Sequence, residues 1–189
     1  MRKIYIEAGA NNGIFQSRSI HLQNNNDYFG ILIEPHKKEY ENCVKNRKND
    51  RTKIYNCCLV SFDFKEEEAV LHKHKNFTAM NSMIPSKKQI FTGSVKVKAK
   101  TMQSILDENN ITHVDNLFLD VEGYELQVLS GVDFDRVTFG NIELENHANL
   151  LSENKKESIS KYKEFMNKHG YKLIEINEKE GNPKMVFEK

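Results

Sequence analysis

Apolar stretches of strand length alternate with helical patterns over the first third of the chain. Residues 3–7, 28–34 and 52–60 are apolar runs, and residues 15–23 and 36–47 carry helical patterns between them. Strands that alternate with helices build a parallel sheet whose two faces are covered by those helices. The pattern therefore predicts an α/β fold with a parallel sheet at its centre.

Residues 61–100 interrupt this alternation. They hold a short apolar stretch at 69–72, a polar loop at 76–88 and the alternating sequence SVKVKAK at 94–100. Alternation with a period of two is typical of a strand. We therefore expect two short strands and a loop here instead of another strand and helix.

The alternation of strands and helices resumes after residue 100. The expected elements are a helix at 101–109, a strand at 116–122, a helix at 124–131 and a strand at 139–146.

A long polar helix and a hairpin are expected at the end of the chain. The helix covers about 153–168, and Gly170 is placed to stop it, because glycine adopts the left-handed conformation in which helices end. Residues 171–178 and 184–189 then predict an antiparallel hairpin around a turn at 181–183.

Length and cysteine content bound the class of protein. A chain of 189 residues with 38% hydrophobic residues fits one domain, 1–189, that buries its own core. Cys43, Cys57 and Cys58 are odd in number and form no CxxC pair, which favours a reducing compartment, and we expect a cytoplasmic protein. No stretch approaches the roughly 20 apolar residues of a membrane span, and the N-terminus lacks the apolar segment of a signal peptide.

The net charge of +1 argues against general affinity for nucleic acid, yet the charges are unevenly distributed. Residues 84–100 hold five lysines and no acid, whereas residues 102–150 hold ten acids and one arginine. We interpret the lysine-rich segment as a solvated loop. The alternative is contact with an anionic substrate.

The sequence IYIEAGANNG at residues 4–13 places an acid and two glycines at the end of the first expected strand. Glycine lets the backbone approach a ligand closely, and we expect Gly13 to open the next helix. The middle glycine of a dinucleotide-binding motif is missing, and an acid would repel a pyrophosphate. The same acid attracts an ammonium or sulfonium, which points to S-adenosylmethionine with Glu7 beside the methionine ammonium. The residues that we assign to this cradle are Glu7, Gly9, Ala10, Asn11 and Gly13.

Glu34 and Pro35 follow the second expected strand. An acid at this strand end can accept hydrogen bonds from both ribose hydroxyls, although it would suit a nicotinamide cofactor or cap the next helix as well. The adenine is then expected beside Cys58 and Leu59 at the end of the third strand. Ser61 or Asp63 would bind its amino group.

The segment LFLDVEGYELQVLSG at residues 117–131 resembles the FkbM-type S-adenosylmethionine-dependent methyltransferases, and D-V-E-G-x-E is its most specific part. Other segments resemble motifs of that family in the same order: residues 6–13, 32–35, 95–106 and 141–145. The resemblance implies a class I methyltransferase fold with strand order 3-2-1-4-5-7-6 and an antiparallel seventh strand. It also implies methyl transfer, usually to a hydroxyl oxygen. Phe118 departs from the family, since many members carry a polar residue there.

An acidic rim is expected where the fourth and fifth strands end. Asp120 can face the methyl group or the acceptor, and Glu122, Glu143 and His147 are further candidates for catalysis, with Glu145 near the same rim. Such carboxylates could hold Mg²⁺, but acids at strand ends are common without a metal, so we expect none. We interpret the acid that opens the helix at 125 as a cap.

The acceptor is the open part of this interpretation. We expect a hydroxyl on a small molecule, sugar or lipid. Methylation of RNA is an alternative supported only by the lysines at 87–100, which lack interleaved aromatic residues. A non-catalytic subunit that keeps the fold is a second alternative, favoured slightly by Phe118. The sequence leaves the oligomeric state open.

Overall fold

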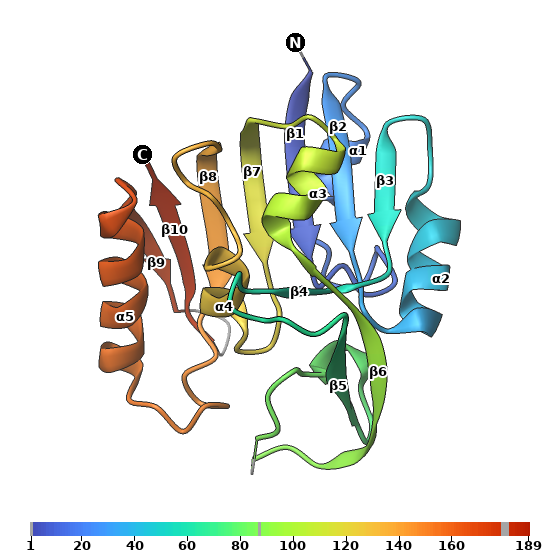
Figure 1. Cartoon of the computed structure of the whole chain (residues 1–189), viewed down its shortest axis with the longest axis vertical. Coiled ribbons are helices and arrows are strands. Elements are labelled where there is room, and N and C mark those ends of the chain that lie inside the picture. Colours follow the sequence, from blue (N-terminus) through green and yellow to red (C-terminus); the bar gives the residue numbers. More distant parts are fainter. Residues whose placement is uncertain (1, 87, 179–181) are drawn as a thin grey trace.

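The computed structural model describes residues 2–86, 88–178 and 182–189, which form a seven-stranded main sheet and a three-stranded small sheet (Figure 1). Across the main sheet the strands are β3 (Thr52–Tyr55), β2 (Tyr28–Ile33), β1 (Lys3–Ala8), β7 (His113–Leu119), β8 (Thr138–Glu145), β10 (Lys184–Glu188) and β9 (Lys172–Asn177). Numbered along the chain within this sheet, the order is 3-2-1-4-5-7-6, and β10 is antiparallel to both of its neighbours. The expected methyltransferase fold is confirmed.

Alternate residues of the central strands face different helices. Ile6 and Leu117 belong to a core that includes side chains of α3 (Met102–Glu108), α4 (Glu125–Leu129) and α5 (Lys155–Lys168). Tyr5, Leu32 and Phe118 belong to a second core with side chains of α1 (Ile20–Gln23) and α2 (Lys37–Arg47). Both faces of the sheet are therefore buried, and Phe118 contributes to the packing of one of them.

The carboxyl ends of β1, β2, β7 and β8 share one edge of the main sheet because these strands are parallel. The small sheet lies beyond this edge (Figure 1). It consists of β4 (Cys58–Val60), β6 (Phe91–Thr101) and β5 (Glu68–His74). This arrangement places the segment 61–100 over the ends of the strands.

The expected third strand at 52–60 is wrong in its extent. The chain leaves the main sheet after β3, and β4 pairs with β6 instead. Between them, the side-chain amide of Asn56 donates to the backbone carbonyls of Glu34 and Pro35. These bonds fasten the chain to the end of β2 at the point where it changes sheets.

The expected helix at 15–23 is also wrong, since only the four residues of α1 are helical. Gly9, Asn11, Gly13 and Gln16 all have positive φ angles, so the preceding residues form an irregular loop, and Gly13 opens no helix. The side chain of Asn12 accepts hydrogen bonds from two backbone amides of this loop. Such local bonds compete with the helical pattern. We call residues 9–19 the glycine loop.

The other expected elements are confirmed. The helix expected at 153–168 begins at Lys155, because the Asn154 side chain accepts from the amides of Lys156 and Glu157. Gly170 follows it with a φ of 83°. The terminal hairpin is β9 with β10, and its turn at 181–183 lies partly outside the described residues. Lys87, one of the lysines of the segment 84–100, also lies outside them. Within the described part of the chain, no helix has the length and apolar character needed to cross a membrane.

Candidate functional site

A cavity of about 910 Å³, including open solvent at its mouth, lies at the carboxyl edge of the main sheet. Its walls come from the ends of β1, β2 and β7, from the glycine loop, and from β4, β5 and the loop that follows β5. Ligands of open α/β sheets bind at this edge, where the carboxyl ends of the parallel strands meet.

The structure brings most of the predicted cofactor residues together. Those that line the cavity are Glu7, Gly9, Asn11, Glu34, Pro35, Cys58, Leu59 and Asp120. Ala10 and Gly13 do not line it. Ala10 packs in the second core, and Gly13 faces Cys43 and Arg47 of α2.

Gly9 is required by the close approach of two strand ends. Its φ is 85°, and a Cβ atom there would lie 1.8 Å from the carbonyl oxygen of Asp120. No side chain fits in that space. The glycine therefore allows the end of β1 to lie directly against the end of β7, where Asp120 enters the cavity.

Glu7 fixes the glycine loop to the sheet. Its carboxylate accepts hydrogen bonds from the hydroxyls of Ser17 (2.8 Å) and Ser19 (2.5 Å) and from the backbone amide of Arg18 (2.7 Å). Arg47 is buried beneath this group, 3.8 Å from the Glu7 carboxylate, and donates to both serine hydroxyls. The acid predicted to meet the ligand ammonium thus has a structural role that the sequence did not indicate.

Glu34 lies at the end of β2 between the glycine loop and the start of α2. Its carboxylate accepts from the backbone amides of Asn11 (2.8 Å) and His36 (2.7 Å). Burial raises the pKa of Glu34 to about 7, although both of these hydrogen bonds lower it. The carboxylate is therefore held in place by backbone donors, with no cation as its hydrogen-bond donor among the described residues.

Asp120 and Glu122 are the rim acids that face the cavity. No described residue donates a hydrogen bond to either carboxylate, although Arg18 and His147 lie 3.7 Å from Asp120. Burial raises the pKa of Asp120 to about 6, with the nearby Glu145 adding to the effect. Burial also raises the pKa of Glu122 to about 7. Both groups can exchange protons near neutral pH.

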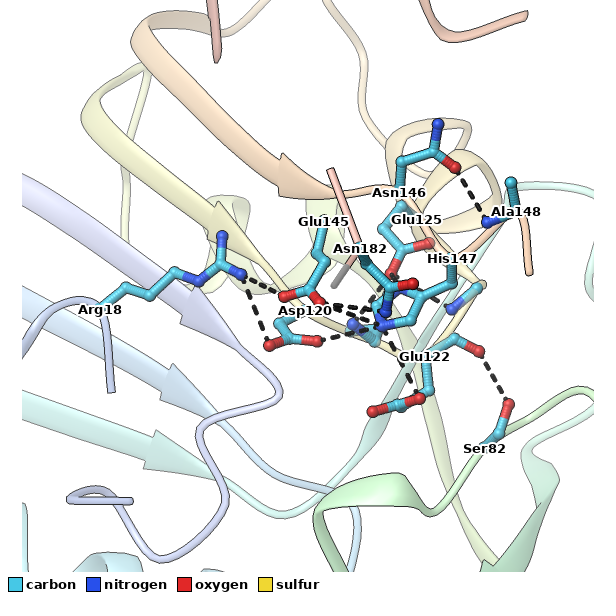
Figure 2. A network of polar contacts seen from close by, with 12 residues as sticks. Arg18, Ser82, Asp120, Glu122, Glu125, Glu145, Asn146, His147, Ala148 and Asn182 are labelled. Atoms are coloured by element: carbon cyan, nitrogen blue, oxygen red, sulfur yellow. Dashed lines mark hydrogen bonds and ion pairs between the residues drawn. The ribbon is translucent and has the colours of Figure 1, made fainter. Parts of the chain in front are cut away.

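His147 is buried, with only 3% of its surface exposed. Its Nδ1 lies 3.1 Å from Glu125, and its Nε2 lies 3.7 Å from both Asp120 and Glu122 (Figure 2). Burial lowers the pKa of His147, but the carboxylates of Glu125, Glu122 and Asp120 together raise it to about 10. His147 is therefore a fixed cation behind the rim and not a base poised near neutrality.

Glu125 joins the turn after β7 to α5. It is fully buried and accepts from the amides of Val121 (3.1 Å) and Gly123 (3.3 Å) and from the hydroxyl of Tyr162 (3.1 Å). This agrees with the expected structural role at the start of α4. Burial raises the pKa of Glu125, but the His147 imidazolium and the backbone hydrogen bonds lower it by more. The net pKa is below its ordinary value, so the acid stays ionised.

Arg18 is the functional candidate that the sequence missed. Its guanidinium donates to Glu143 (2.8 Å) and Glu145 (2.5 Å) of β8 and lies beside Asp120. Figure 2 shows Arg18 with Glu145 and Asp120. The two glutamates therefore share one side of β8, as their alternation predicted. Glu143 and His147 do not line the cavity, whereas Arg18 does. Because Arg18 lies in a segment that was expected to be helical, no sequence signal showed where its side chain would point.

Asp120, Glu122 and His147 also offer ligand atoms within 4.8 Å of one another, close enough for one metal ion. An imidazole ligates a metal only through an unprotonated nitrogen. The raised pKa of His147 opposes that form. Binding of an ion by these three residues would therefore require His147 to lose its proton.

Comparisons with known proteins agree with this fold. A family model described as the methyltransferase FkbM domain matches residues 7–173. The chain is similar to the crystal structure of an FkbM methyltransferase from Methylobacillus flagellatus KT, with 11% identity and a TM-score of 0.57 over 100% of this chain and 44% of that one. No curated protein matches.

Two further structures show the same fold. A fibrillarin pre-rRNA processing protein from Methanococcus jannaschii is 12% identical with a TM-score of 0.57, over 99% of this chain and 66% of that one. A precorrin-6y C5,15-methyltransferase from Geobacter metallireducens GS-15 is 13% identical with a TM-score of 0.52, over 100% of this chain and 81% of that one. The chain thus spans less than half of the FkbM structure and about two thirds of the fibrillarin.

Proposed function

This chain belongs to the FkbM family of methyltransferases, and from that premise we propose that it binds S-adenosylmethionine and methylates a hydroxyl oxygen of a small molecule, sugar or lipid. We propose that the whole chain, 1–189, acts as one domain, and that it is cytoplasmic, which its three free buried cysteines favour. The observation that carries the proposal is that Glu34 and Asp120 line one cavity on either side of the Gly9 cradle.

The residues of the cavity suit this cofactor. Gly9 lets the ends of β1 and β7 meet at the cavity, and the Glu34 carboxylate is placed to accept from ribose hydroxyls. Asp120 and Glu122 supply negative charge for a sulfonium, and Cys58 and Leu59 supply an apolar wall for the adenine. The cofactor, when bound, contributes an activated methyl group.

The protein must position the acceptor hydroxyl and remove its proton. Asp120 and Glu122 are the proposed proton acceptors, because both face the cavity and the pKa of each lies near neutrality. Glu143 and His147 do not line the cavity and are proposed to support these two acids. His147 holds positive charge beside the two acids, and Glu143 holds the Arg18 guanidinium at the rim.

The charge of the rim favours an uncharged acceptor over a nucleic acid. Carboxylates of β8 and of the turn after β7 gather beside the cavity, and they would repel a phosphate backbone. On β6, Lys96 pairs with Glu68 and Lys100 with Glu108. The lysines that supported an RNA substrate are thus partly neutralised by the chain itself.

The proposal is tested by calorimetric titration of the purified chain with S-adenosylhomocysteine, with NADH as a parallel control and EDTA in a repeat. We expect binding in the micromolar range for S-adenosylhomocysteine only, unchanged by EDTA. Binding of NADH, or of neither compound, would overturn the proposal. Once binding has been measured, transfer of a labelled methyl group to panels of sugars, lipids and RNA identifies the acceptor.

A further inference from the structure

Asn81 is a polar residue on a mostly apolar wall of the cavity. The small sheet and the loop after β5 line the cavity with Leu71, Thr78, Ala79, Asn81 and Met83. Leu71 and Met83 pack together with Cys58. A ligand group that lies against this wall must be largely apolar, because the wall offers it few hydrogen-bond partners.

The orientation of the Asn81 amide follows from its hydrogen bond. The backbone amide of His74 donates to the Asn81 side chain over 2.9 Å. A backbone N–H can only donate, so the atom that receives this bond is the oxygen, Oδ1. The nitrogen, Nδ2, is then fixed on the other side of the group.

That nitrogen is a buried donor without a hydrogen-bond acceptor among the described residues. Buried polar groups in folded proteins are almost always paired, so an unpaired one calls for an explanation. Asn81 lines the cavity, so a ligand is the natural partner. Ser61 and Asp63, which the sequence suggested for this role, do not line the cavity.

We propose that Asn81 Nδ2 donates a hydrogen bond to a ring nitrogen of the cofactor adenine and so selects for that base. The inference rests on the proposed function. Adenine is flat and apolar on its faces, and its unprotonated ring nitrogens accept hydrogen bonds at its edge. The charged methionine end of the cofactor would lie near Asp120 and Arg18, which also line the cavity.

The substitution N81D removes the donor and keeps the fold of the loop. One carboxylate oxygen still accepts from the His74 amide, and the other replaces Nδ2 with an atom that cannot donate when ionised. The matched control is N76D, which places the same charge in the same loop at an exposed residue that does not line the cavity. If N81D does not fold, N81S takes its place in every measurement.

The experiment is a calorimetric cycle of three proteins, the parent, N81D and N76D, against four ligands. The ligands are S-adenosylhomocysteine and its 1-deaza, 3-deaza and 7-deaza forms, each of which replaces one ring nitrogen by carbon. We expect N81D to bind S-adenosylhomocysteine about tenfold more weakly, and N76D to bind it as the parent does. One deaza form should bind the parent about tenfold more weakly than S-adenosylhomocysteine does. N81D should bind that form and S-adenosylhomocysteine with the same affinity.

The outcomes separate the two claims. Failure of the parent to bind S-adenosylhomocysteine overturns the proposed function. Tight binding by the parent with no loss in N81D overturns only the role of Asn81. An equal loss in N81D for all four ligands also overturns it, because a contact to one ring nitrogen must vanish with that nitrogen.

Discussion

Asp120, Glu122 and His147 form one charged group in which each residue sets the protonation of the others. His147 stays protonated because Glu125 lies behind it, and its imidazolium in turn lowers the pKa of both rim acids against the effect of burial. Single substitutions in this group therefore have distinct, predictable effects on binding, turnover and pH dependence.

D120N should lower the rate of methyl transfer by about a hundredfold or more, because an amide accepts no proton from the acceptor. Affinity for S-adenosylhomocysteine should change by less than about threefold, as Asp120 takes no hydrogen bond from the described chain. Single-turnover transfer and calorimetry measure the two quantities. The control is D63N, outside the cavity. A loss confined to binding would assign Asp120 to the cofactor alone.

E34Q should weaken binding of S-adenosylhomocysteine about tenfold, since a ribose hydroxyl loses a charged acceptor. The fold should persist, because the remaining amide oxygen can still accept one backbone bond. Calorimetry and thermal melting check these points, with E41Q on the exposed side of α2 as control. Unchanged affinity in E34Q would show that the cofactor is wrongly placed.

H147Q should make the free energy of unfolding less dependent on pH above neutrality. The pKa of His147 is about 10 in the folded protein, above its ordinary value of 6.5, so its stabilisation is fully present below pH 6.5 and is lost as pH rises through 10. Relative to H147Q, the parent should lose roughly 2 kcal/mol or more in its free energy of unfolding between pH 7 and 10. Urea unfolding measures this, and H21Q, at an exposed site, is the control. Parallel curves for parent and H147Q would contradict the assignment.

At the scale of elements, the glycine loop connects the cofactor and acceptor parts of the cavity. Its first residues donate to Glu34, its last residues are bound by Glu7 and Arg47, and Arg18 reaches from it to β8. The loop has no regular structure of its own, so its shape depends on these buried polar contacts.

R47M should therefore destabilise the fold by about 3 kcal/mol, because Glu7 loses its buried cation and both serines lose a donor. R136M removes an exposed ion pair with Asp107 and should cost less than about 1 kcal/mol. Urea unfolding compares the two. Equal effects would mean that Arg47 does not hold the loop.

At the scale of the whole molecule, the cavity lies between two sheets that carry different parts of the proposed site. The main sheet supplies the acids and the glycine loop, and the small sheet supplies the apolar wall with Asn81. A ligand in the cavity must therefore contact both sheets.

Addition of S-adenosylhomocysteine should slow amide hydrogen exchange in residues 9–19 and 77–83 by about tenfold at saturation, since bound ligand suppresses local opening. β9, at the far edge of the main sheet, should be unaffected. Exchange followed by mass spectrometry resolves these segments. Protection of the glycine loop without residues 77–83 would remove the small sheet from the site.

The sequence by itself determined the order of strands and helices, the parallel sheet and the placement of Glu7, Glu34 and Asp120 at one edge. These features follow from local periodicity and from the rule that parallel strands end together. The family resemblance added the antiparallel strand and the methyltransferase fold.

Only the tertiary structure decided which side chains meet. Arg18 and Glu143 lie 125 positions apart, and nothing local indicates that they bind each other. The proton on His147 depends on the buried Glu125, and Asn81 reaches the cavity only because β4 leaves the main sheet to pair with β6. Contacts between distant residues and the burial that sets a pKa are properties of the packed chain, so no spacing in the sequence can give them.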